Sequence, residues 1–302
     1  MTLPGKSASL ENEAVFAATE DDYGTSYYFR GNVENNYVNY SGMCWRIVRV
    51  DGNGNIKIVL ADANNECNSS GYSITNEYSS YILENQIGFY SMDSYVSSVS
   101  SWAASKNLDT SKLYEAEWCY DASIAINNTF EWDDQYNPEY DPYHSISKEF
   151  TYGPLSRLEN KQPSLKCNFT GELNSVSEKY KSIYGALTAD EVVYAGSSYD
   201  YRSEFNYYLM TNATGTRENS RGTYWTMSLA DYRYEDLVDK NIDYTNLFFV
   251  YQSGYVSYDN ITGEWGNAHL RPSVVLESGV FATTDVESGY AAGTYQNPFN
   301  VE

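Results

Sequence analysis

Histidine and serine side chains are the usual agents of nucleophilic hydrolysis, and this 302-residue chain offers little of the pattern they need. Two histidines, His144 and His269, are available as general bases. No Gly-x-Ser-x-Gly turn exposes a serine nucleophile, and the glycine patterns that cradle phosphates or dinucleotides are missing. His269 precedes an expected strand, a position typical of a hydrogen-bonded structural histidine. The sequence therefore predicts neither a serine hydrolase nor a bound cofactor.

The four cysteines are the next candidates for chemistry. Cys44, Cys67, Cys119 and Cys167 lack the closely spaced pairs of a structural zinc site, so no metal is expected. Three disulfide connectivities are possible, and the one with the smallest loops is Cys44–Cys67 with Cys119–Cys167. Four reduced, buried thiols remain the alternative. Disulfides would indicate an oxidising compartment, so we expect an extracellular or cell-surface location, with any signal or anchor segment outside this chain.

Paired carboxylates could hydrolyse a glycosidic bond if two of them lie roughly 5–10 Å apart across a cleft. The 41 Asp and Glu residues supply many pairs, but the separation is a property of the folded chain. A solvated acidic surface is the alternative for each pair, and it is favoured. The candidates are Glu117, Asp121, Asp133, Asp134, Asp231 and Glu235.

Composition excludes several classes of protein. The chain has 19 Lys and Arg against 41 Asp and Glu, a formal net charge of −22, which would repel the phosphates of nucleic acid. Aromatic residues make up 16 % of the chain, too many for a disordered acidic tail. No apolar run approaches the ~20 residues of a transmembrane helix. The sequence thus predicts a globular protein that binds no nucleic acid and has no transmembrane segment.

Hydrophobic periodicity predicts one α+β domain over residues 23–302, preceded by a flexible lead over residues 1–22. The clearest hairpin joins strands 44–50 and 56–60 through the Gly/Asn turn 51–55. That turn lacks the glycine and glutamate of a calcium-binding EF-hand loop. Helices are expected over 95–104 and 187–196, the second with a Thr188/Glu191 capping box and a Gly196 stop. Further strands are expected at 27–30, 37–40, 207–210, 224–228, 247–251 and 271–276.

Residues 231–267 combine tyrosine with acidic and amide side chains, a mixture typical of binding loops. Tyrosine offers a large amphipathic contact area with few rotatable bonds. The competing interpretation is that tyrosine is simply abundant, since 32 occur along the chain. We expect these loops to form a ligand-binding face made of Asp231, Tyr232, Arg233, Tyr234, Asp236, Tyr244, Tyr255, Tyr258, Asp259, Trp265 and Asn267.

Several motifs resemble a family of secreted or surface proteins of Firmicutes and Tenericutes gut bacteria. They are Tyr27-Tyr28-Phe29-Arg30-Gly31-Asn32-Val33, Cys44-Trp45-Arg46-Ile47-Val48-Arg49-Val50, Glu117-Trp118-Cys119, Pro163-Ser164-Leu165-Lys166-Cys167 and residues 187–196. The tail is similar to the formylglycine-generating-enzyme-like branch of the C-type lectin fold, through residues 224–228, 249–256 and Leu270-Arg271-Pro272-Ser273-Val274-Val275-Leu276. This resemblance implies mixed, mainly antiparallel sheets with short helices and long loops.

The resemblance also bears on activity. The oxidases of that fold use a late cysteine pair, and no cysteine follows Cys167, so oxidase activity is not expected. Trp132-Asp133-Asp134 and Asn137-Pro138-Glu139 do not match the calcium-binding lectin motifs. The resemblance therefore implies a non-enzymatic module that binds a protein or glycan ligand on another cell surface through residues 231–267.

Three alternatives stay open. The variable proteins of diversity-generating retroelements place diversified Tyr, Asn, Asp and Ser residues on a similar face. A structural subunit of the cell envelope and a carboxylate-dependent glycan hydrolase are the other two.

Overall fold

A computed structural model describes residues 15–68, 92–125, 146–167, 178–199, 207–210, 223–237, 240–251, 253–260, 269–281 and 289–302. The fold is α+β, with mainly antiparallel sheets and three short helices among these residues. The predicted fold class is confirmed at this level. The helices are α1 (Met92–Ser105), α2 (Gly153–Glu159) and α3 (Ala189–Ala195).

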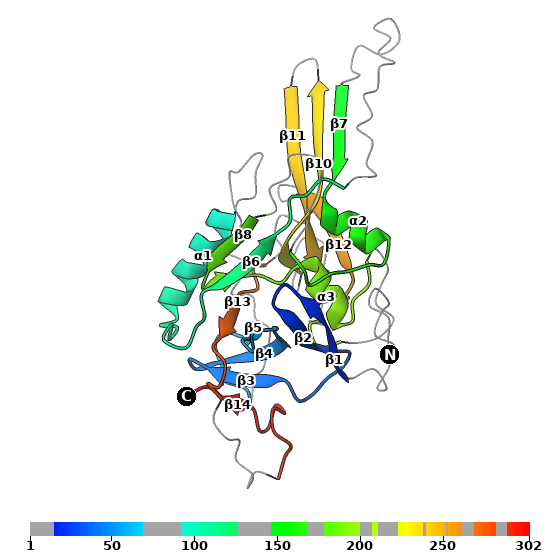
Figure 1. Cartoon of the computed structure of the whole chain (residues 1–302). Helices are drawn as coiled ribbons and strands as arrows, with labels where there is room; N and C mark the ends of the chain where they lie inside the picture. The colour runs from blue at the N-terminus through cyan, green and yellow to red at the C-terminus, as the bar shows by residue number, and fades with distance from the viewer. Residues whose placement is uncertain are drawn as a thin grey trace, which may run out of the picture.

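The largest sheet has eight strands. They are β1 (Val15–Asp21), β2 (Gly24–Arg30), β3 (Tyr37–Tyr40), β4 (Met43–Val50), β5 (Ile56–Asp62), β9 (Tyr184–Gly185), β13 (Ser273–Leu276) and β14 (Phe299–Asn300). The hydrogen-bonded order is β1-β2-β4-β5-β13-β9, with β3 on β4 and β14 parallel to β3. Strands from both ends of the described chain therefore share one sheet (Figure 1).

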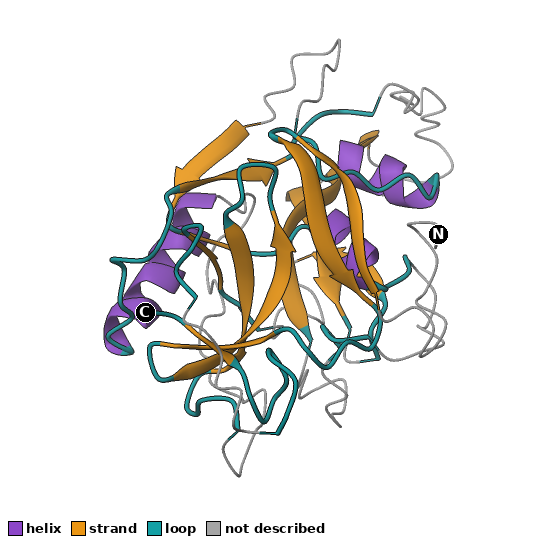
Figure 2. Ribbon diagram, turned by 60° about the horizontal axis from the view of Figure 1, so that its bottom comes forward, coloured by secondary structure: helices purple, strands orange, loops and turns teal. Residues whose placement is uncertain are grey.

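A second sheet of four strands has the order β12-β11-β10-β7. Its members are β7 (Ile146–Thr151), β10 (Tyr224–Leu237), β11 (Lys240–Val250) and β12 (Val256–Asn260), and β6 (Ala116–Tyr120) pairs separately with β8 (Glu178–Ser182). The long strands β10 and β11, with β7 beside β10, extend beyond the other labelled helices and strands in Figure 1. The longest helix, α1, lies on one side of the sheets and the two short helices lie on the other (Figures 1 and 2).

The predicted hairpin of residues 44–60 is confirmed as β4 and β5. Its turn is closed by Asp51, whose Oδ1 accepts hydrogen bonds of 2.9 Å from the backbone N–H groups of Asn53 and Asn55. Gly54 adopts φ 87°, a conformation that glycine reaches without strain. Trp45 and Ile58, one on each strand, are fully buried in the main core. The local sequence was therefore sufficient to define this element.

Both predicted helices are confirmed. The helix expected over 95–104 is α1, and the one expected over 187–196 is α3. The Thr188 side chain accepts from the backbone N–H of Glu191, and the Glu191 carboxylate accepts from that of Thr188, which completes the predicted capping box. Gly196 ends the helix at φ 126°.

Two expectations about elements are wrong. A flexible lead is expected over residues 1–22; residues 1–14 lie outside the described residues, but β1 occupies 15–21 and pairs with β2 along its whole length. Burial alternates along β1, with Phe16 exposed and Ala17 half-buried, and the strand is held in place by its pairing with β2. A strand is expected at residues 207–210, where the structure has a turn with Met210 N donating to Tyr207 O. Tyr207 and Leu209 are buried in the core, and this burial, not a strand, accounts for the hydrophobic pattern of the segment.

Both disulfides of the expected connectivity are present, Cys44–Cys67 and Cys119–Cys167. Cys44 and Cys67 are buried beside Ala61. The second bond joins β6 to the segment 163–167, which follows α2. Within the described parts of the chain, no helix is long and apolar enough to cross a membrane.

Candidate functional site

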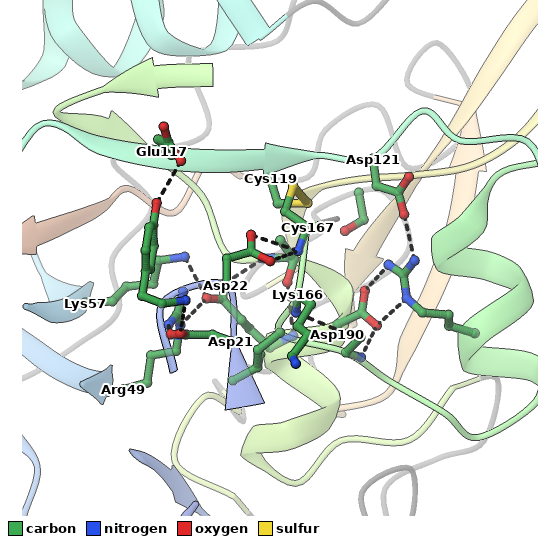
Figure 3. A pocket seen from close by; sticks show the side chains of 17 residues that line it. Asp21, Asp22, Arg49, Lys57, Glu117, Cys119, Asp121, Lys166, Cys167 and Asp190 are labelled. Atoms are coloured by element: carbon green, nitrogen blue, oxygen red, sulfur yellow. Dashed lines mark hydrogen bonds and ion pairs between the residues drawn. A yellow bond between two sulfur atoms is a disulfide. The ribbon is translucent and has the colours of Figure 1, made fainter. Parts of the chain in front are cut away.

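A charged pocket lies where the β1–β2 turn meets β4, β5, β6, α2 and α3 (Figure 3). Its cavity volume is about 40 Å³, and it opens to solvent. The segment 163–167, called the strap below, forms one wall. The ionisable lining residues are Asp21, Asp22, Tyr23, Arg49, Lys57, Glu117, Asp121, Arg157, Lys166, Asp190 and Glu191.

Glu191, on the first turn of α3, is the centre of one ion cluster. Its Oε1 accepts from Arg49 Nε at 2.9 Å and from Lys57 Nζ at 2.6 Å. Arg49 also binds Asp21 at 2.8 Å, and Lys57 lies 4.5 Å from the ring centroid of Trp118. Burial alone would raise the pKa of Glu191, but the two cations lower it to about 2. Burial lowers the pKa of Lys57 by more than Glu191 raises it.

Arg157, on α2, is the centre of the second cluster. Its Nη1 binds Asp121 at 2.7 Å, and its Nε and Nη2 bind both oxygens of Asp190 at 3.0 and 2.8 Å. Burial opposes the charge of Arg157, yet the two carboxylates raise its pKa above the ordinary value. Asp190 accepts a further hydrogen bond of 2.9 Å from the backbone N–H of Ser164 on the strap. This cluster therefore joins α2, α3, the strap and the end of β6.

The rim of the pocket is formed by the β1–β2 turn. Tyr23, 39 % exposed, donates its hydroxyl proton to Glu117 on β6 at 2.8 Å. Burial and the Glu117 carboxylate together raise the pKa of this hydroxyl. Asp22 accepts from the backbone N–H of Cys167 at 3.0 Å. In Figure 3 the Cys119–Cys167 disulfide lies between the two ion clusters.

The charged groups of the pocket form ion pairs that hold elements together, and they do not have the features of a catalytic acid–base pair. A glycosidase acid needs a carboxyl whose pKa is raised, whereas the cations beside Glu191 lower its pKa. Asp121 and Asp190 are both bound by Arg157. Buried ion pairs of this kind fix the arrangement of the elements that carry them. The pocket therefore joins the β1–β2 turn, two helices and the strap.

Of the expected carboxylate candidates, the structure brings two to this pocket. Glu117 and Asp121 both lie on or just after β6 and line it. Asp231 lies elsewhere, at the base of the extended sheet, and Glu235 is in β10. Asp133 and Asp134 fall outside the described residues.

The expected binding face corresponds largely to strands, not to loops. Arg233, Tyr234 and Asp236 are in β10 and Tyr244 is in β11. The register pairs Tyr234 with Asp243 and with Lys148 of β7, and pairs Arg233 with Tyr244. A mixture of tyrosine and acidic residues resembles a binding loop, but in a hairpin the pairing partner fixes the backbone. The expectation of loops over 231–267 is therefore corrected for the residues of β10, β11 and β12, while residues 261–268 lie outside the described chain.

Other expected residues lie at the base of this sheet. Asp231 is buried and accepts a 2.5 Å hydrogen bond from Asn246 Nδ2, so it holds β10 to β11. Tyr232 is half-buried against the main core. Tyr258 stacks parallel to Tyr199 at 6.4 Å.

The remaining expected residues fall near β12 or outside the described chain. Tyr255 packs on Tyr251, with ring centroids 5.1 Å apart. Asp259 is half-buried in β12. Trp265 and Asn267 lie outside the described residues.

The sequence did not single out most of the pocket residues. One signal was present: Lys57 stands between Ile56 and Ile58 in a strand that is otherwise apolar. A lysine at such a position requires a buried counter-ion. Its partner Glu191 lies 134 residues away, so the pair could not be identified from the sequence.

Comparison with known proteins adds no relative. A scan against protein-family models, a search of curated proteins and a search of solved structures each return no match.

Proposed function

We propose that this chain is a non-enzymatic recognition module whose extended β7–β10–β11 sheet binds a protein or glycan ligand on another cell surface. The observation that supports this proposal is the extension of the sheet beyond the other labelled helices and strands (Figure 1). A surface that stands away from the body can reach a ligand on an opposing cell. A C-type-lectin-like frame, implied by the resemblance of the tail, is part of the proposal.

The register supports a recognition face on one side of this sheet. Alternate residues of a strand occupy opposite faces, and β10 pairs regularly with β7 from residue 231 to residue 236. Positions 234 and 236, which are Tyr and Asp, therefore share one face of the extended part, beyond Tyr232, which packs against the main core. Aromatic residues supply most of the affinity at protein interfaces, while polar groups orient the ligand.

An extracellular or cell-surface location is the second part of the proposal. Disulfides persist in oxidising compartments and are rare in the cytosol, and the two bonds of this chain are compatible with such a setting. The net charge of −22 also suits a soluble module that avoids nucleic acid.

The test is a binding screen with matched variants. The full chain is applied to an array of defined glycans and to intact bacterial and epithelial cells, and binding is quantified by fluorescence. For any probe that binds, Tyr234→Ala should weaken binding at least about tenfold, as expected when an aromatic anchor is lost. Tyr27→Ala is the control, because Tyr27 is an exposed tyrosine of β2, which does not belong to the β7–β10–β11 sheet. Equal binding by the Tyr234 variant, or equal loss in the control, would refute the proposed face.

A further inference from the structure

The two disulfides differ in their access to solvent. Cys44 and Cys67 are 0 % and 3 % exposed and pack against Tyr37 and Tyr295. Cys119 is half-buried, and both Cys119 and Cys167 line the charged pocket (Figure 3). The pocket reaches the surface, because its lining includes exposed residues of the β1–β2 turn and the strap. A small molecule that enters the pocket would meet the second disulfide but not the first.

The Cys119–Cys167 bond is the covalent attachment of the strap to β6. The hydrogen bonds of the strap include those from Cys167 N to Asp22, from Ser164 N to Asp190, and from the Tyr194 hydroxyl to Pro163 O. Each such bond contributes on the order of 1 kcal/mol. Without the disulfide, bonds of this size would have to hold the strap against the chain entropy that its release recovers.

We propose that the pocket is a thiol–disulfide exchange site, in which a small dithiol reduces Cys119–Cys167 selectively and releases the strap. A thiolate of the dithiol attacks Sγ of Cys119, the more exposed residue of the pair, and forms a mixed disulfide while Cys167 leaves as a thiolate. The second thiolate of the dithiol then attacks the first sulfur of the same dithiol, which is bonded to Sγ of Cys119 in the mixed disulfide. Cys119 leaves as a thiolate, and the dithiol becomes a cyclic disulfide.

The exchange is balanced in atoms and electrons. The dithiol gives up two electrons and becomes oxidised, and the protein disulfide accepts them. The two cysteine thiolates take protons from water. The reaction uses no residue of the β7–β10–β11 sheet, so it is independent of the proposed ligand-binding face.

The first experiment measures which disulfide opens. The oxidised, folded chain is incubated with dithiothreitol without denaturant, quenched at intervals with iodoacetamide, and mapped by peptide mass spectrometry. Cys119 and Cys167 should become alkylated at an initial rate at least tenfold above that of Cys44 and Cys67. Equal rates, or earlier opening of Cys44–Cys67, would overturn the proposal.

A pair of variants tests whether the dithiol enters through the pocket. Tyr23→Ala removes the side chain that bridges the rim to Glu117, so it should accelerate reduction of Cys119–Cys167 several-fold. Tyr27→Ala, on the same hairpin but not in the pocket lining, should leave the rate unchanged. Equal acceleration in both variants would show that reduction proceeds through opening of the hairpin, and would overturn entry through the pocket. If the dithiol enters through the pocket, low concentrations of urea should not change the rate at which Cys119–Cys167 is reduced. A rate that rises with urea would show that the chain must first unfold locally.

Release of the strap has its own readout. Hydrogen exchange at the amides of Ser164 and Cys167 should become at least tenfold faster after reduction. The amide of Tyr251, which donates to Tyr255 O and does not line the pocket, is the internal reference. A Cys119→Ser/Cys167→Ser variant should exchange like the reduced protein. Unchanged exchange at Ser164 and Cys167 in both samples would show that the disulfide does not hold the strap.

Discussion

Glu191 serves two parts of the structure at the same time. One carboxylate oxygen caps α3 by accepting from the backbone N–H of Thr188, and the other binds Arg49 and Lys57. The side chain is 3 % exposed, so its charge is compensated by these partners rather than by water. Removing one member of a buried ion cluster leaves the others buried and uncompensated, which is the costly case.

Glu191→Gln should therefore destabilise the protein strongly at neutral pH. Glutamine keeps an oxygen for the capping hydrogen bond, so the loss reports the ion pairs. We expect the free energy of unfolding in urea to fall by about 3 kcal/mol. Glu115→Gln is the control, because the Lys181–Glu115 pair is 66 % and 58 % exposed, and exposed pairs contribute at most about 1 kcal/mol. Equal losses in the two variants would contradict this view of the cluster.

The same cluster makes stability depend on acid. The pKa of Glu191 is about 2 in the folded protein and ordinarily 4.5, so between these values the unfolded chain binds more protons. The contribution of Glu191 is therefore fully present above about pH 5 and is lost as the pH falls towards about 2. The Glu191→Gln variant should show a flatter decline in unfolding free energy over this range. Parallel curves for the two proteins would contradict the assignment.

At the scale of elements, the structure separates locally encoded segments from those that need a partner. The β4–β5 hairpin and α3 carry their own turn and cap, and both were predicted. β1 has no such signal, and it is ordered by pairing with β2 and by the contact of Asp21 with Arg49. The long β10–β11 hairpin resembles a binding loop in composition because its outer part has few apolar residues.

The cap of α3 gives a prediction at this scale. Thr188→Ala removes the side chain that accepts from the N–H of Glu191, so the free energy of unfolding in urea should fall by about 1 kcal/mol. Thr188→Ser keeps the hydroxyl and should retain most of the stability. If the serine variant lost as much as the alanine variant, the effect would come from the missing methyl group and not from the cap.

At the scale of the whole molecule, the net charge of −22 opposes the compact state through self-repulsion. Added salt screens this repulsion, and the screening length shortens from ~30 Å at 0.01 M to ~8 Å at 0.15 M. The buried clusters are screened much less, so they should not offset the gain. The melting temperature should therefore rise by a few degrees when sodium chloride is increased over this range. A lower melting temperature at the higher salt concentration would show that attractive surface pairs dominate.

The sequence by itself determined the features whose signals are local: the α+β class, the β4–β5 turn and the capping box of α3. Each depends on residues close along the chain or on composition. Only the tertiary structure decided the charged pocket, because Glu191 meets Lys57 and Arg49 from more than 130 residues away. It also decided that residues 231–237 and 240–246 are paired strands, since strand pairing, and not tyrosine content, fixes that backbone.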